Sequence, residues 1–167
     1  MTGRLELIVR RPAVEQREVI DTGELRVDLG LVGDTWRDRG STRNGDLPDP
    51  DRQLTIMSTV ALALITHDRA SWPLAGDQLY VDFELDEDTF PAGTRLQIGG
   101  AVVELTAAPH TGCAKFRARF GEDALRLVNT PEGRRRRLRG ANARVVIDGT
   151  IRAGDEVVAL IDAQPAR

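Results

Sequence analysis

The pattern of apolar and polar residues predicts a chain built mainly from short strands. The mixed alternation over residues 4–10 is typical of a partly buried strand, and Pro12 ends it. Residues 15–20 and 24–29 repeat this pattern around the turn sequence Asp21-Thr22-Gly23, which predicts a hairpin.

The strand pattern continues along the rest of the chain. Leu79, Val81 and Phe83 alternate with Tyr80 and mark one buried face, and Gly99-Gly100 is a two-residue hairpin turn. Further strands are predicted over residues 53–57, 79–83, 95–98, 101–107, 143–147 and 156–161.

Two segments in the first half of the chain depart from the strand pattern. Residues 30–34 break regular structure, and residues 37–51 contain almost nothing apolar, so we expect an exposed loop of the kind that often borders a site. Ser58 or Thr59 can cap a helix over residues 60–65.

The hydrophobic period changes again after residue 112. Cys113, Phe116 and Phe120 fall on one face of a helix, with Cys113 in its first turn and Gly121 at its end. Two further helical segments are expected, over residues 122–129 and from residue 131 onward. With about eight strands and two or three short helices, the fold class expected is mainly β, a closed barrel with helical inserts.

The length and composition are those of one ordinary domain. We expect residues 1–163 to form it, with 164–167 as a short tail. No apolar run approaches the roughly 20 residues that a membrane span needs, and residues 1–11 lack the pattern of a signal peptide, so we expect a cytoplasmic protein. The chain has one cysteine and two histidines, which excludes an internal disulfide and a closed structural zinc site.

Charge is distributed unevenly along the chain. The net charge is -3, so no general attraction for nucleic acid or an acidic membrane is expected. Residues 110–139, however, contain nine basic and three acidic side chains. This basic region could hold a small anion such as a phosphate.

The only cysteine lies in this basic region, close to the only lysine. Nearby cations favour the thiolate form of Cys113, which is the form that acts as a nucleophile or a soft metal ligand. His110 could donate a hydrogen bond to the sulfur or pass a proton. The residues expected to bind an anionic cofactor are Thr111, Lys115, Arg117 and Arg119. The alternative is a small buried cysteine without chemistry, beside solvated cations.

Several segments, in their order, resemble the MOSC domain, the family related to the C-terminal domain of molybdenum cofactor sulfurases. The similarity lies in the order of these segments and in the single cysteine after the hairpin. The matching stretches are residues 30–34, 76–81, 90–99 and 109–120.

This resemblance implies a closed β-barrel of the MOSC type that binds the molybdenum-molybdopterin cofactor. In enzymes of the family the cysteine ligates molybdenum, which would make Cys113 the metal ligand. Pyridoxal phosphate is not expected, because the desulfurase domain of the sulfurases has no counterpart in this chain.

Two functions follow from the resemblance. The first is a small oxidoreductase that reduces an N–O bond in a small-molecule substrate, with electrons from a donor protein. The second is a non-redox carrier in which Cys113 holds the cofactor, or a persulfide received from a sulfur-donor protein. A binding barrel with an inert cysteine is the third possibility.

Other charged residues have plainer explanations. The run Arg134 to Arg137, with Arg139, is more often a solvated helix end than a site, and its best functional use is a second phosphate clamp. Asp34, Asp77 and Asn142 lie at predicted turns, where local hydrogen bonds to the backbone account for them.

Overall fold

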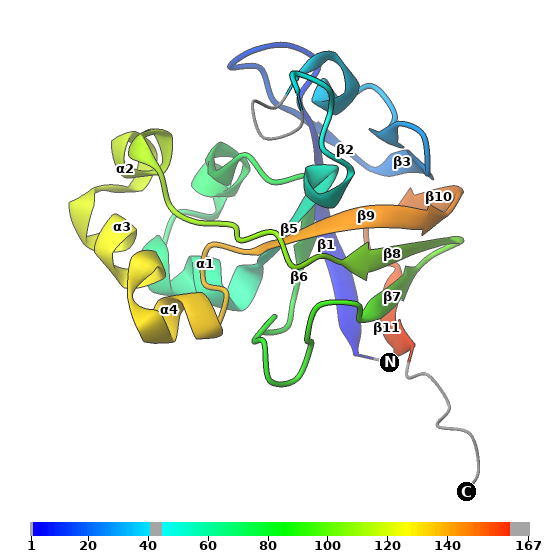
Figure 1. Cartoon of the computed structure of the whole chain (residues 1–167). Coiled ribbons are helices and arrows are strands. Elements are labelled where there is room, and N and C mark those ends of the chain that lie inside the picture. The colour runs from blue at the N-terminus through cyan, green and yellow to red at the C-terminus, as the bar shows by residue number, and fades with distance from the viewer. Residues whose placement is uncertain (1, 41–44, 161–167) are drawn as a thin grey trace, which may run out of the picture.

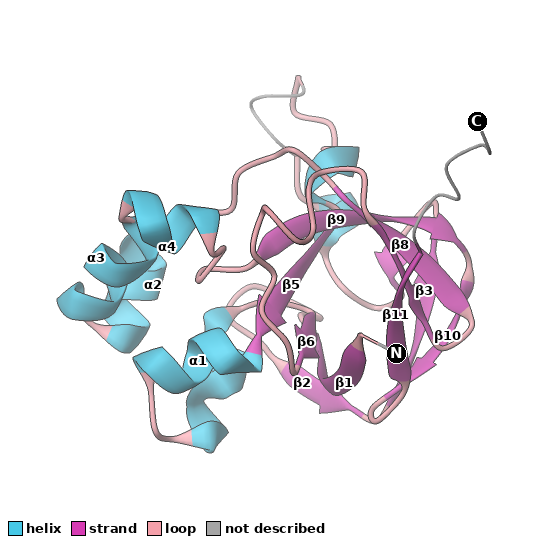
Figure 2. Ribbon diagram, turned by 90° about the horizontal axis from the view of Figure 1, so that it is seen from below, coloured by secondary structure: helices cyan, strands magenta, loops and turns pink. Residues whose placement is uncertain are grey.

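A closed β-barrel forms the centre of the molecule in the computed structural model, which describes residues 2–40 and 45–160 (Figures 1 and 2). The barrel closes because β1 pairs with β11, with Gly3 opposite Val157. The mainly β fold with a closed barrel is therefore confirmed. In barrel order its strands are β11 (Glu156–Leu160), β7 (Arg95–Ile98), β8 (Ala101–Leu105), β9 (Ala141–Ile147), β5 (Leu54–Ser58), β6 (Leu79–Val81) and β1 (Gly3–Arg10).

One pair of neighbouring barrel strands is parallel. The strands β5 and β6 run in the same direction, whereas the other neighbours in the barrel are antiparallel. A parallel pair needs a crossover connection, which α1 (Thr59–Ile65) and the 3-10 helix η4 (Arg69–Ala75) supply on the outside of the barrel. The side chain of Ser58 caps α1 by accepting a hydrogen bond from the backbone N–H of Ala61, as the sequence predicted.

The hairpin predicted around residues 21–23 is wrong. The strand β2 (Glu18–Ile20) pairs with β1, whereas β3 (Thr22–Arg26) belongs to a separate sheet with β10 and β4. That sheet uses β4 (Gly30–Leu31), in a segment expected to break regular structure, and β10 (Gly149–Arg152). Alternation identifies the buried face of a strand but not its partner, and here distant strands were the better partners.

The strand β6 is buried on both faces. Leu79 and Val81 face the barrel core, and Tyr80 is equally buried on the outer face with Val9 and Met57. The hydroxyl of Tyr80 donates a hydrogen bond to the carbonyl of Trp72 at 3.1 Å. One buried face was predicted, but the crossover helices cover the second.

Most of the helical part of the chain lies on one side of the barrel (Figure 2). Phe116 and Leu138 pack with Ala61 in a cluster between these helices. Cys113 precedes α2 instead of lying in its first turn, and Gly121 ends the helix as predicted. The helices after α1 are α2 (Ala114–Phe120), α3 (Glu122–Asn129) and α4 (Pro131–Arg135).

The region predicted as a long loop contains short 3-10 helices, η1 (Trp36–Asp38) and η3 (Pro50–Arg52). Residues 41–44 of that loop, the end of the last predicted strand at residue 161 and the predicted tail at 164–167 lie outside the described residues. Among the described residues, no helix combines the length and apolar character that crossing a bilayer requires.

Candidate functional site

A buried carboxylate joins three segments that are distant in the sequence. Asp77, between η4 and β6, accepts a hydrogen bond from Nη1 of Arg139 at 2.8 Å and lies 2.9 Å from Nε2 of His110. The side chain of Asp77 is fully buried and that of Arg139 is 9% exposed. Arg139 also donates to the carbonyl of Ala75 at 2.8 Å, and its guanidinium lies over the ring of Phe116. The explanation of Asp77 by local turn hydrogen bonds is therefore wrong.

This arrangement sets the ionisation of Asp77 and His110. Burial alone would raise the pKa of Asp77, but Arg139 and then His110 outweigh it and hold that pKa far below its usual range. Burial, followed by Arg139, lowers the pKa of His110, although Asp77 opposes this shift. His110 is therefore a neutral imidazole at pH 7. Because an ionised carboxylate can only accept, Nε2 carries the hydrogen and Nδ1 remains an acceptor.

Polar contacts fix the loop that carries His110 and Cys113. The amide of Asn142 donates to the carbonyls of Ala108 and Pro109, at 3.0 and 3.2 Å. The amide of Asn129 bonds both the N–H and the carbonyl of Gly112. Asn142 thus acts over a long distance in the sequence, and its explanation as a local turn residue is wrong as well.

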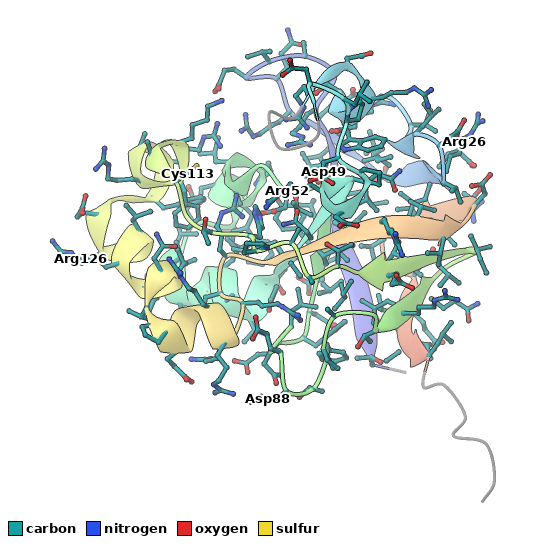
Figure 3. The ribbon with its side chains drawn as sticks, in the orientation of Figure 1. Arg26, Asp49, Arg52, Asp88, Cys113 and Arg126 are labelled. Atoms are coloured by element: carbon teal, nitrogen blue, oxygen red, sulfur yellow. The ribbon has the colours of Figure 1, made fainter. Side chains whose placement is uncertain are left out.

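The thiol of Cys113 is exposed at the N-cap position of α2 (Figure 3). It makes no capping hydrogen bond. Burial opposes its ionisation, but the nearby backbone N–H groups of Phe116 and Lys115 favour the charged form. The charges of Arg139 and Arg119 act in the same direction, so the pKa of Cys113 is lower than that of an ordinary thiol.

Cys113 opens into a cavity of about 240 Å³, here called the cationic cavity. His110 lines it too, and Glu15 is its one carboxylate among the described residues. Its positive side chains are Arg11, Arg17, Arg39, Lys115, Arg119 and Arg139.

These cations are incompletely neutralised by the protein. The carboxylate of Glu15 lies 3.5 Å from Nζ of Lys115 and 3.4 Å from Nη2 of Arg119. Arg17, in contrast, has no hydrogen bond or ion pair among the described residues. The Nε atoms of Arg17 and Arg139 are buried without a partner there. Burial and then the charge of Arg119 lower the pKa of Arg17. An anion would satisfy these donors.

Gly76 places the backbone beside the cations. Its φ of +82° is in the left-handed region, and a Cβ added there would lie 3.4 Å from Nη2 of Arg17 and 3.5 Å from Nη1 of Arg119. A side chain at this position would be strained and would enter the space between the two guanidinium groups.

The structure brings together some of the residues predicted from sequence. Cys113, His110, Lys115 and Arg119 line the cationic cavity. Thr111 lines a second cavity on the other side of His110. Arg117 lines neither and lies 3.9 Å from Glu122 at the surface, which leaves its cofactor role without a supporting contact.

Sequence reasoning missed Arg17 and the central role of Arg139 and Asp77. Arg17 lies far from Cys113 in the sequence, and nothing in its own surroundings distinguishes it. Arg139 is separated from the preceding arginines by the apolar Leu138, a weak sign that it faces a different environment.

The cationic cavity combines an acidified thiol with donors for an anion. Among the residues that the structure describes, no group of three or more His, Cys, Asp and Glu side chains could hold a metal ion. As a thiolate, Cys113 would be a soft ligand for a metal.

Comparisons with known proteins agree with this fold. The family profile of the MOSC domain matches residues 45–158, about two thirds of the chain. The solved structure of the YuaD protein from Bacillus subtilis is similar, with 17% identity, coverage of 94% of each chain and a TM-score of 0.70. YiiM from Escherichia coli is 20% identical over 96% of this chain and 71% of its own, with a TM-score of 0.63. No curated protein sequence matches the chain.

The substitution Asp77→Asn should lower the free energy of unfolding by about 3–5 kcal/mol at pH 7, because it leaves the charge of Arg139 buried without its counter-ion. Urea denaturation measures this loss. Because the pKa of Asp77 is lowered by folding, its contribution is complete above about pH 4 and declines as the pH falls below that value. A loss under about 1 kcal/mol would contradict the account.

The alkylation rate of Cys113 by iodoacetamide should rise with pH around a midpoint below the value of about 8.5 for a free thiol. Arg119→Gln should move the midpoint upward, because it removes a charge that stabilises the thiolate. Arg117→Gln, on the same helix but outside the cavity, is the matched control and should leave it unchanged. Equal midpoints in all three proteins would refute the electrostatic explanation.

Proposed function

Because the chain belongs to the MOSC domain family, which is associated with the molybdenum cofactor, we propose that it binds a molybdopterin-type cofactor in the cationic cavity. The observation that carries the proposal is the convergence of six positive side chains and one exposed, acidified thiol on the same cavity. These features match the two ends of such a cofactor, which are an anionic phosphate and a metal that prefers sulfur.

The phosphate is proposed to contact Arg17, Arg119 and Lys115. Arg17 has unused donors, the other two share the exposed carboxylate of Glu15, and Arg119 also donates to the carbonyl of Leu74 at 3.2 Å. Guanidinium groups bind phosphate through paired N–H donors, which suits Arg17 and Arg119 on the two sides of Gly76. The buried Nε of Arg139 is a further donor close to the thiol.

Cys113 is proposed to be the protein ligand of molybdenum. Its lowered pKa provides the thiolate that metal ligation requires. When bound, the cofactor supplies a two-electron redox centre. The fixed loop on both sides of Cys113 holds the sulfur in one position, which reduces the ordering needed on binding.

His110 is proposed to handle protons at Nδ1. Asp77 fixes the ring through Nε2, so the imidazole has one orientation beside the two cavities. The neutral ring can accept a proton from water and release it again during turnover. The lowered pKa of His110 favours this neutral form over an imidazolium that would stay charged between turnovers.

The reaction proposed is the reductive cleavage of an N–O bond in a small molecule. Two electrons and two protons convert an N-hydroxyl group into N–H and water. The electrons must come from a donor protein. The thiol of Cys113 is exposed beside the cationic cavity, so the proposed metal site is accessible from the surface.

A carrier function is the second candidate, and the exposure of the Cys113 thiol favours it. The thiolate would attack the outer sulfur of a donor protein's persulfide, so that the sulfur passes to Cys113 and the donor leaves as a thiolate. Cationic side chains around the product would stabilise its negative charge. Persulfide labelling that is present in the wild type and lost in Cys113→Ala would favour this function.

Cys113→Ala should remove molybdenum from protein purified from a host that makes the cofactor. Metal analysis and the fluorescence of the oxidised pterin measure the content of both components. Loss of metal with retention of some pterin is expected, because the phosphate donors remain. Full metal content and activity in the variant would exclude the cysteine as ligand, and wild-type protein that refuses added cofactor would exclude the proposal.

Arg17→Gln should weaken the binding of inorganic phosphate, used as a probe, by about 10–100-fold, which corresponds to the loss of a charge-assisted hydrogen bond of about 1.5–3 kcal/mol. Isothermal titration measures the affinity, with Arg117→Gln as the matched control. Thermal unfolding of the empty variant should show no loss of stability, because Arg17 has no partner to lose. Equal phosphate affinity in both variants would remove Arg17 from the site.

A further inference from the structure

The five arginines at residues 134–139 have three different environments. Arg135 pairs with Glu132 and Asp88, and Arg136 pairs with Glu84, so both hold the loop after β6 against α4. Arg139 is buried against Asp77. Arg134 and Arg137 instead line the second cavity, which has a volume of about 430 Å³.

Both of these arginines have unused donors. The side chain of Arg134 makes no hydrogen bond or ion pair among the described residues. Arg137 uses only Nη1, which donates to the carbonyls of Leu85 at 3.0 Å and Phe90 at 2.6 Å, so its Nε and Nη2 have no partner there. Arg134 belongs to α4 and Arg137 follows the end of this helix, and both side chains line the same cavity.

The remaining lining has the character of a site for a small organic molecule. Small apolar residues and Gly140 make up half of the lining, and polar or charged residues make up the other half. Glu87 also lines the cavity and offsets one of the two positive charges, so a ligand with a single negative charge fits better than a phosphate dianion. The apolar lining residues are Pro91, Ala92, Ala107, Ala108, Pro109 and Ala141.

His110 belongs to the walls of both cavities. Gly140 allows this position, since a Cβ there would lie 3.3 Å from Cδ2 of His110 and 2.5 Å from the carbonyl oxygen of Ile56. A molecule in the second cavity therefore lies against the imidazole that also faces the cationic cavity.

We propose that the second cavity binds a planar organic monocarboxylate, with the carboxylate on Arg134 and Arg137 and the ring between the alanine and proline side chains. That this ligand is the substrate rests on the proposed function, whereas its binding does not. The arginine run is then neither a plain solvated helix end nor a second phosphate clamp. It anchors a loop through two residues and recognises a ligand through two others.

Benzoate and benzamide are suitable probes because they have nearly the same shape and differ in charge. In protein-observed NMR titrations, benzoate should bind at least tenfold more tightly than benzamide and shift the resonances of residues 106–111 and 140–142. Arg134→Gln should reduce benzoate affinity to that of benzamide. Arg126→Gln is the matched control and should bind like the wild type, because Arg126 is an exposed arginine on α3 that lines neither cavity and points away from the barrel (Figure 3).

A second variant tests the location without removing a charge. Ala107 is exposed and lines the second cavity, so Ala107→Leu should block both probes by filling space while the barrel folds normally. Unchanged benzoate affinity in Arg134→Gln and Ala107→Leu, or shifts confined to Lys115 and Arg119, would overturn the proposal.

The same measurements distinguish this site from the cofactor site. Cys113→Ala should retain benzoate binding, and Arg134→Gln should retain the pterin and molybdenum of the wild type. If wild-type protein binds benzoate as described but never cofactor, the proposed function fails and this inference stands. If Arg134→Gln loses the cofactor, the arginine belongs to the cofactor site and this inference fails.

Discussion

The side of the molecule that carries both cavities depends on the burial of one carboxylate between a guanidinium and an imidazole. Asp77 is ionised in a place where burial alone would keep it neutral, because Arg139 and His110 compensate for the lost hydration. Asp77 lies just before β6, His110 lies in the loop before α2, and Arg139 lies just before β9. Their contact therefore fixes the relative positions of the barrel, the cysteine loop and the helical layer.

Both cavities lie beside the barrel and not inside it. The interior is filled by the apolar core, whose members include Leu5, Ile56, Leu79 and Val103. The parallel pair of β5 and β6 places its crossover helices on the outer face, and α2 to α4 extend the same side (Figure 1). The two cavities form where loops meet this helical layer, so their lining can vary without disturbing the strand pairing.

The two cavities differ in charge in a way that suits different ligands. Counting only the residues that the structure describes, six cations and one carboxylate line the first, and two cations and one carboxylate line the second. Burial and, after it, the charge of Arg119 lower the pKa of Arg17, so the neighbouring positive charge adds an electrostatic cost in the empty protein. Such unfavourable clustering is common where a protein binds a ligand of opposite charge, because binding removes the repulsion.

The sequence alone determined the strand-rich class, the hairpin at residues 99–100, the helix ended by Gly121 and the choice of Cys113 as the residue to examine. These features depend on neighbouring residues and on period, which a sequence displays directly. Tertiary structure alone decided that residues 18–20 and 22–26 enter different sheets, that Tyr80 is buried under helices, and that Asp77 meets Arg139. Tertiary structure alone also placed Arg17 in the cationic cavity, Arg134 in the second cavity and Arg117 at the surface beside Glu122. Each of these outcomes depends on contacts between segments far apart in the chain. The periodicity of a local sequence indicates the type of element and its buried face, but it does not identify the distant segment that the element contacts.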